Sequence, residues 1–212
     1  MSSFRRRLMM AKRSLPYVPL EYVQADGHQY FNTRVLFTSD MKIKVSIKFL
    51  DEQMSDITGR WLGTKGILLS RMYGSTYGRI NNSYNVPSYI NTKYDIDFSL
   101  DGFVVNGVNL GGYTASDYIA LEVDTHSSIG IDESYIHLLT SLNSYNEPVY
   151  PYSQDSQGGT VFYYSQIYTG EVLKRDLIPC KDKQGVVCMY DKVTETFFYN
   201  QGTGSFTAGP EI

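Results

Sequence analysis

The most regularly patterned stretch of the chain is RDLIPCKDKQGVVCMYDKVTETFFYNQGTGSFTAG, from Arg175 to Gly209. Short apolar segments alternate with polar ones and break at Pro or Gly. The pattern predicts a strand ending at Pro179, a turn over KDKQG, a returning strand VVCMYD, another strand TETFFYN, and a closing segment QGTGSFTAG. We interpret the glycines as turn residues of a sheet, because no Gly-rich loop here leads into a helix with a Lys-Ser/Thr pair.

The same two-residue period recurs through the rest of the chain. MKIKVSIKF, from Met41 to Phe49, alternates apolar and polar residues and predicts a strand with one buried face and one lysine-rich face. In YDIDFSLDGFVVNGVNL, the dipeptides Asp101-Gly102 and Asn106-Gly107 predict tight hairpin turns between short strands. Further strand candidates are YIALEV, SYIHLLTSL and TVFYYSQIY. Regular short strands with turn signals predict an all-β sandwich or barrel.

Composition is that of one globular domain. The chain has 212 residues, of which 42% are hydrophobic and 19% charged, with 19 tyrosines but a single tryptophan. No apolar run is long enough to span a membrane, and the N-terminal residues lack the apolar core of a secretory signal. The two cysteines, Cys180 and Cys188, are expected on neighbouring strands of one hairpin. Two free thiols are favoured over a disulfide, and the disulfide remains an open alternative.

Charge is distributed unevenly along the chain. Five basic residues precede the first acidic one, Glu21, within MSSFRRRLMMAKRSLP. The remainder holds 14 of the 19 basic residues and all 22 acidic ones, so its net charge is near −8 while the first 16 residues carry +5. Such asymmetry is typical of an interaction tail. We therefore predict two parts, a basic arm over residues 1–16 and a β domain over residues 17–212.

The arm has the spacing of a short amphipathic helix. Phe4, Leu8 and Ala11 recur at i, i+4 and i+7, and so short a helix needs a partner surface to be stable. Docking on another subunit of an assembly is the favoured interpretation. Contact with nucleic acid, an organellar transit peptide and a disordered tail are the alternatives. The residues expected to anchor the arm are Phe4, Arg5, Arg6, Arg7, Leu8, Lys12 and Arg13.

A second region has the composition of a contact surface. RMYGSTYGRINNSYNVPSYIN, residues 71–91, interleaves tyrosines with asparagines and glycines. Aromatic faces beside amides suit sugar rings and protein surfaces alike, although ordinary packing of strands and loops explains them too. The residues predicted to contact a glycan or protein are Trp61, Tyr73, Tyr77, Asn81, Asn82, Tyr84 and Tyr89.

At both ends the sequence resembles the concanavalin A-like, LamG-like domains of phage virion proteins and gut-bacterial surface proteins. The C-terminal motifs are SQIYTGEVLKRDLIPC, GVVCMYD and FFYNQGTGSFTAG, and the N-terminal one is LPYVPLEYVQADGHQYFNT; GRWLGTKG is similar more loosely. The likeness covers roughly residues 15–60 and 160–209. Cys188 stands where the family usually has Gly, and Met189 replaces a Leu. The resemblance implies a jelly-roll sandwich.

Catalytic patterns are incomplete. Glucanases of this fold carry E-x-D-x-E or E-x-D-x-x-E on one strand, which places an acid and a nucleophile beside the scissile bond. Glu122-Val123-Asp124 begins such a motif, but Thr125-His126-Ser127 follows and the second Glu is missing. His28, His126 and His137 are scattered, and Asp95, Asp97 and Asp101 fit a solvated strand face better than a calcium loop. The sequence therefore predicts no enzyme, no cofactor and no metal site.

The resemblance and the arm together give our functional expectation. We expect a non-enzymatic phage virion protein, a head-fibre, capsid-decoration or tail module, made in the host cytoplasm and held on the particle by its arm. Its expected partners are other virion proteins and further copies of itself. A module that binds carbohydrate on a phage or bacterial surface is the alternative, with a host glycan as ligand, and a glycoside hydrolase is a distant third. A membrane is not expected as a partner, and nucleic acid is disfavoured because the body is acidic.

Overall fold

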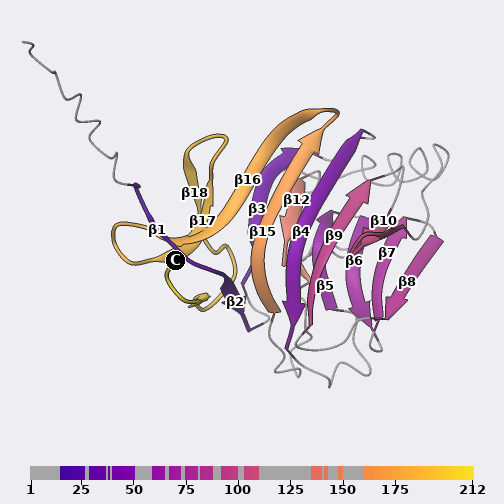
Figure 1. Ribbon diagram of the computed structural model, residues 1–212, viewed down its shortest axis with the longest axis horizontal. Helices are drawn as coiled ribbons and strands as arrows, with labels where there is room; N and C mark the ends of the chain where they lie inside the picture. Colours follow the sequence, from indigo (N-terminus) through magenta and orange to yellow (C-terminus); the bar gives the residue numbers. More distant parts are fainter. Residues whose placement is uncertain are drawn as a thin grey trace, which may run out of the picture.

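The computed structural model describes residues 15–26, 29–36, 38, 40–50, 59–64, 67–72, 75–80, 82–87, 92–99, 103–109, 135–139, 141–142, 148–149 and 160–212. Throughout these ranges the regular structure is β, with no helix, and every strand pair is antiparallel (Figure 1). The predicted all-β class is therefore confirmed. The arm residues 1–14 and the strand candidate YIALEV lie outside the described residues.

The larger of the two main sheets contains eleven strands, whose central order is β11-β10-β9-β4-β15-β16-β17-β18. Its members are β1 (Val18–Pro19), β2 (Val23–Ala25), β4 (Met41–Phe49), β9 (Lys93–Ser99), β10 (Phe103–Val105), β11 (Val108–Asn109), β15 (Thr160–Thr169), β16 (Val172–Lys181), β17 (Val187–Asp191), β18 (Thr196–Phe198) and β19 (Thr207–Ala208). Off the central path, β1 pairs with β16, and β2 pairs with both β15 and β19.

The smaller sheet has the order β3-β12-β5-β6-β7-β8. Its members are β3 (Phe31–Leu36), β12 (Tyr135–Leu138), β5 (Gly59–Thr64), β6 (Ile67–Met72), β7 (Ser75–Ile80) and β8 (Asn82–Pro87). A separate pair joins β13 (Ser141–Leu142) to β14 (Pro148–Val149). Figure 1 shows the smaller sheet behind and beside the larger one.

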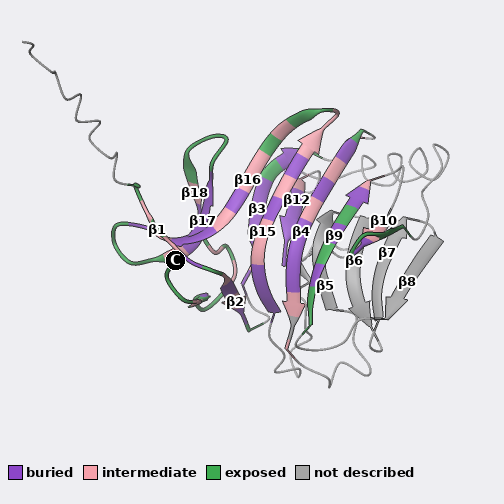
Figure 2. Ribbon diagram, in the orientation of Figure 1, coloured by how far each residue is buried: buried purple, intermediate pink, exposed green. Residues whose placement is uncertain are grey.

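An apolar cluster of described residues joins the two sheets. In β4 the residues Met41, Ile43, Val45 and Ile47 are at most 2% exposed, as the two-residue period predicts (Figure 2). Buried side chains of β3 and β12 belong to the same cluster. Apolar faces from two antiparallel sheets therefore share one interior, an arrangement consistent with a β-sandwich.

The predicted meander after residue 93 is confirmed in its described part. β9, β10 and β11 follow one another in the sheet, and Val105 pairs with Val108. Asn106 (φ 48°) and Gly107 (φ 80°) both adopt the left-handed conformation between them, as a tight two-residue turn requires. Asp101-Gly102, the other predicted turn, lies outside the described residues.

The prediction that a strand ends at Pro179 is wrong, because β16 continues to Lys181. The Pro179 carbonyl accepts a hydrogen bond from the Leu20 amide, 3.0 Å away. A residue in an extended strand points its nitrogen and carbonyl to the same side, so the missing N–H of Pro179 faces the short strand β1 and not β17. The ladder with β17 thus loses no hydrogen bond.

Two other predicted strands are shorter than expected. β18 begins only at Thr196, because Lys192–Glu195 form a turn in which Glu195 has φ 55°. SYIHLLTSL divides into β12 and β13, and Leu139 between them has φ 67°. A residue with positive φ interrupts the regular extended backbone at its position.

The two ends of the described chain lie together. β1 and β2 pair with β16, β15 and β19, and an isolated bridge joins Leu20 to Glu211. The Ile212 amide donates to the Pro19 carbonyl over 3.2 Å. Residues 18–25 therefore lie beside β15, β16 and β19 in the larger sheet.

Candidate functional site

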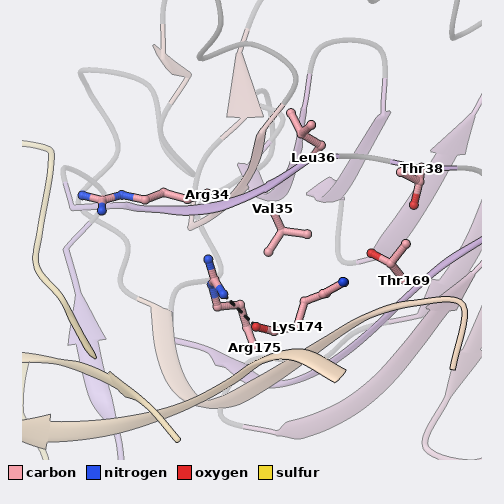
Figure 3. A pocket seen from close by; sticks show the side chains of 7 residues that line it. All are labelled: Arg34, Val35, Leu36, Thr38, Thr169, Lys174 and Arg175. Atoms are coloured by element: carbon pink, nitrogen blue, oxygen red, sulfur yellow. Dashed lines mark hydrogen bonds between the residues drawn. The ribbon is translucent and has the colours of Figure 1, made fainter. Parts of the chain in front are cut away.

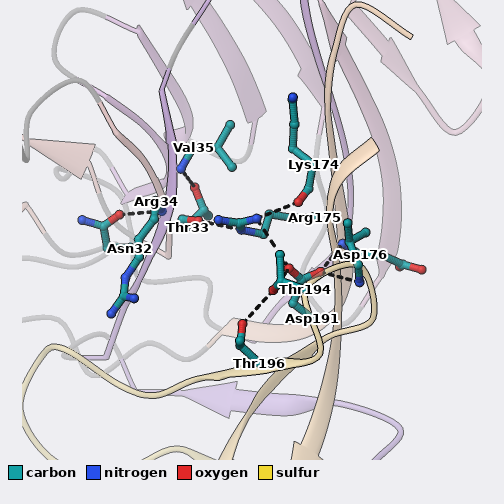
Figure 4. A network of polar contacts seen from close by, with 11 residues as sticks. Asn32, Thr33, Arg34, Val35, Lys174, Arg175, Asp176, Asp191, Thr194 and Thr196 are labelled. Atoms are coloured by element: carbon teal, nitrogen blue, oxygen red, sulfur yellow. Dashed lines mark hydrogen bonds and ion pairs between the residues drawn. The ribbon is translucent and has the colours of Figure 1, made fainter. Parts of the chain in front are cut away.

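The side chain of Arg175 links both sheets at one corner of the body. From β16 its Nε donates to the Thr33 carbonyl of β3 (2.9 Å), and its Nη1 donates to the Lys174 carbonyl (2.7 Å) (Figure 4). The guanidinium also lies 5.4 Å from the centre of the Phe198 ring, within range of a cation–π interaction. The planar, multidentate shape of a guanidinium allows one residue to make all these contacts.

Asp191 is the charged partner of Arg175 and is fully buried. Its Oδ2 lies 3.6 Å from Arg175 Nη1, and it accepts hydrogen bonds from the Asp176 amide (2.8 Å), the Val193 amide (3.1 Å) and the Thr194 hydroxyl (2.6 Å). Register places it there, because Asp191 pairs with Leu177 at the end of β17. A buried carboxylate with this many donors is compensated for its lost hydration.

β3 carries a bulge opposite Arg175. Its register with β12 shifts between Tyr135 and His137, and Arg34 has φ 55°, which is uncommon for a residue other than glycine. Side chains hold the bulge: the Arg34 amide donates to Asn32 Oδ1 (2.8 Å), and the Thr33 hydroxyl donates to the Ile136 carbonyl (2.7 Å). Strained backbone of this kind costs on the order of 1–3 kcal/mol.

An open pocket of about 280 Å³ lies between this bulge and the hairpin of β15 and β16. The residues that line it are Arg34, Val35, Leu36, Thr38, Thr169, Lys174 and Arg175. In Figure 3, the Lys174 side chain extends toward Thr169, whereas the Arg34 side chain extends away from the other two cations. The described lining residues offer cationic groups and hydroxyls and include no carboxylate, so they suit a carboxylate or another anionic group better than a cation.

Burial affects the ionisation of the pocket's inner cation. Desolvation lowers the pKa of Arg175, the Asp191 carboxylate acts in the opposite direction, and the nearby charge of Arg34 lowers it further. A guanidinium nevertheless stays charged at physiological pH. Arg175 therefore keeps its charge in the wall of the pocket, balanced by Asp191 behind it, and the described lining contains no paired nucleophile and base.

A second cluster covers the opposite face of the sheet near its C-terminal strands. Cys180, Cys188 and Tyr190 are buried there, with Tyr17, Ile178 and Phe197 packed against them. The rings of Tyr17 and Tyr190 are 4.4 Å apart, and those of Tyr190 and Phe197 are 5.2 Å apart. The predicted hairpin pairing of the cysteines is confirmed, and both are free thiols with their Sγ atoms 3.6 Å apart.

The residues predicted for glycan or protein contact are only partly placed. Trp61 lies in β5 at a register shift between Arg60 and Leu62, and Tyr77, Asn82 and Tyr84 lie in β7 and β8. Tyr77 pairs with Asn85, and Gly78 pairs with Tyr84, so the two tyrosines occupy ladder positions of opposite parity. The other three predicted positions, Tyr73, Asn81 and Tyr89, lie outside the described residues.

None of the anchoring residues predicted in the arm falls within the described chain; they are Phe4, Arg5, Arg6, Arg7, Leu8, Lys12 and Arg13. The incomplete motif at Glu122 and Asp124 also lies outside it, as do His28, His126 and Asp101. His137 is 4% exposed in β12 and packs beside Tyr30. Asp95 and Asp97 are exposed on one face of β9, as the alternation predicts.

Sequence reasoning did not identify the pocket. Arg175 and Lys174 stand within the patterned C-terminal stretch, but nothing in it indicates that their side chains face β3. Arg34 carries no turn signal, because arginine is not a residue type that favours positive φ. The Asn32-Thr33 pair before it was the available hint, since short polar side chains often hydrogen-bond to nearby backbone.

The described residues contain neither a metal-ligand cluster nor a membrane-spanning helix. No group of three or more His, Cys, Asp or Glu side chains there could hold a metal ion. The same part of the chain contains no helix of the length and hydropathy needed to cross a membrane. In comparisons with known proteins, no family model matches the chain and no curated protein matches it.

Proposed function

We propose that this protein is a non-catalytic structural module of a phage virion, a jelly-roll body held on the particle by its basic N-terminal segment, residues 1–16. The body would project as a head fibre, a capsid decoration or a tail component, in several copies. Support comes from the family resemblance of both ends of the chain and from the charge difference between segment and body. The fold alone is compatible with other functions.

The observation that carries the proposal is the position at which the segment joins the body. β1 pairs with β16 through two residues, Val18 and Pro19, and on its other side the Pro19 carbonyl accepts a hydrogen bond from the Ile212 amide. Leu15 is 56% exposed and Val18 is 40% exposed, so the junction is at the surface. A partner could therefore bind residues 1–16 without displacing any core side chain of the described body.

Charge supports the same role. The segment carries +5 and the rest of the chain about −8. A cationic peptide is attracted to an acidic surface, and complementary charges speed encounter and select the partner more than they add affinity. We infer that the receiving surface on the particle is acidic and has an apolar groove for Phe4 and Leu8.

Deletion of residues 1–16 tests the proposal. The truncated chain is expected to stay folded and soluble, with the thermal unfolding midpoint of the full chain, and to be missing from purified particles. A matched control keeps the length of the chain and replaces Arg5, Arg6, Arg7, Lys12 and Arg13 with glutamine. This variant should incorporate poorly into particles, and the incorporation that remains should not depend on salt concentration. Normal incorporation of the truncated chain would refute anchoring by this segment.

Carbohydrate binding is the second candidate, and the register of β7 and β8 favours it. Tyr77 and Asn85 are register partners in the ladder between β7 and β8, near the edge of the smaller sheet. On a glycan array, the body should then bind sugars that a Tyr77→Ala variant does not. Loss on Lys174→Ala instead would assign binding to the cationic pocket, and an array without hits would reject the candidate.

A further inference from the structure

Cys180 and Cys188 are brought together by a turn whose conformation is fixed locally. Asp182 closes it: its amide donates to the Val186 carbonyl, its carbonyl accepts from the Gly185 amide, and its Oδ1 accepts from the amides of Gln184 and Val186. Gly185 has φ 83°, the left-handed conformation that ends a three-residue hairpin loop. The register that follows pairs Cys180 directly with Cys188.

The strand geometry allows a covalent bond between these residues. The hydrogen bond from Asp182 to Val186 marks that pair as hydrogen-bonded, and hydrogen-bonded pairs recur every second residue, so Cys180 and Cys188 form one as well. The α-carbons of such a pair are about 5.5 Å apart, within the range of about 4.4–6.8 Å that disulfides span. The two Sγ atoms are already in contact at 3.6 Å.

We propose that Cys180 and Cys188 are an oxidation site, at which a small disulfide oxidant converts the two thiols into a cross-strand disulfide. The inference is independent of the virion proposal. The thiolate of one cysteine attacks a sulfur of oxidised glutathione, releases one reduced glutathione, and forms a mixed disulfide. The second thiol then loses its proton, attacks the protein sulfur and releases a second reduced glutathione. Two S–H bonds are lost, one protein S–S bond forms, and glutathione accepts the two electrons.

Access to the thiols requires only local opening. Both cysteines are fully buried, but β1 pairs with the Cys180 backbone through a ladder of only two residues, and the pairing of β17 with β18 stops at Met189. Short strands with few ladder hydrogen bonds open far more often than the whole domain unfolds. The hydrogen bond to Cys188 and burial raise the pKa of Cys180, so the closed state reacts slowly and the open state carries the reaction.

The disulfide would cross-link the two strands of the C-terminal hairpin, and whether it forms would depend on the redox state of the compartment. In a reducing cytoplasm the pair stays as thiols, whereas an oxidising exterior converts it to the disulfide. The hairpin lies beside β1, where residues 1–16 join the body, so oxidation would stiffen the part of the sheet nearest that junction.

The test uses the full chain, reduced, and then incubated with oxidised glutathione both as the folded protein and during refolding from denaturant. In each case we expect a monomer whose mass falls by about 2 Da, the loss of two hydrogens, with both thiols blocked to maleimide. Its unfolding midpoint should rise, and a reductant should reverse the change. The Cys188→Ala control should give no such product.

Two results would overturn the proposal. One is that both thiols still react with maleimide after refolding in oxidised glutathione, because the unfolded chain exposes both thiols to the oxidant. The other is that the pair forms only disulfides between chains, seen as dimers on a non-reducing gel. If Cys188→Ala folds poorly, peptide mapping of the oxidised wild-type chain decides, because a Cys180–Cys188 linked peptide is either present or not.

Discussion

Arg175 on β16 and Asp191 on β17 form an ion pair in which the carboxylate side chain is 0% exposed and the guanidinium side chain 15% exposed. The same guanidinium donates to the Thr33 carbonyl of β3 in the other sheet. One arginine therefore joins the C-terminal hairpin to both layers of the body. Removing it would leave a buried charge with backbone and hydroxyl donors but without its counter-ion.

Replacing this arginine should destabilise the fold strongly. We expect Arg175→Ala to lower the free energy of unfolding by about 3–5 kcal/mol, the range found when one partner of a buried pair is removed. The control is Lys44→Ala, which removes an ion pair with Asp97 whose side chains are 43% and 50% exposed. Such exposed pairs contribute about 0–1 kcal/mol. Urea denaturation measures both, and equal losses would contradict the assigned role.

A substitution in the bulge of β3 is expected to raise the free energy of unfolding. Arg34 has φ 55° and is exposed, so Arg34→Gly should relieve backbone strain and raise the free energy of unfolding by about 0.5–1 kcal/mol. Leu36→Gly, in the same strand without positive φ, should lower it. If Arg34→Gly is instead destabilising, its side chain contributes contacts that outweigh the strain.

The turn at Asp182 predicts a pH dependence. Burial alone would raise the pKa of Asp182, but hydrogen bonds from the Val186 amide, the Tyr199 hydroxyl and the Gln184 amide outweigh it, so the pKa is lowered from 3.8. A carboxyl with a depressed folded pKa adds stability that is present above its unfolded value and lost as pH falls through the folded one. The thermal midpoint should therefore drop below about pH 3.8.

Asp182→Asn is the matching variant, since its side-chain oxygen can still accept from the two backbone amides. It should be less stable at neutral pH and show a shallower acid drop than the wild type. Glu171→Gln is the surface control and should change little, because Glu171 is 92% exposed in its pair with Lys42. Parallel acid curves for Asp182→Asn and the wild type would exclude Asp182 as a source of the pH dependence.

The interlocked ends can be tested at Gly209. A Cβ at this position would lie 2.8 Å from the Tyr22 carbonyl oxygen and ring atoms, closer than real Cβ contacts allow. Gly209→Ala should therefore push the C-terminal segment away from β2 and cost about 1–3 kcal/mol. Gly107→Ala is the comparison: a Cβ there meets nothing within 4 Å, so only its φ of 80° is penalised, by about 1 kcal/mol. Faster hydrogen exchange at the Leu20 and Gly209 amides would locate the damage.

The alternation of apolar and polar residues correctly predicted strands in which every second side chain is buried. β4 follows its alternation, and the Asn106-Gly107 turn follows from residue types that tolerate positive φ. The order of strands across the sheet could not be predicted in this way, because β4 lies between β9 and β15, which are far from it in sequence. The prediction that a strand ends at Pro179 was wrong for the same reason. Whether a strand tolerates a proline depends on which neighbouring strand the proline nitrogen faces.

The candidate site was harder to predict than the fold. The pocket exists only because a bulge on β3 meets the hairpin of β15 and β16, and neither segment alone shows it. The tyrosine-rich region was visible from composition, but its register separates Tyr77 and Tyr84 by parity. Composition indicates that a surface is suited to contact, whereas the partner and geometry depend on tertiary placement.

The most direct test of the proposed function is a cryo-electron microscopy reconstruction of the particle that carries this protein. Our proposal predicts density for residues 1–16 against an acidic surface of another virion protein, with the two-sheet body projecting from β1. Density in which those residues touch only their own chain, or a particle without this chain, would contradict it.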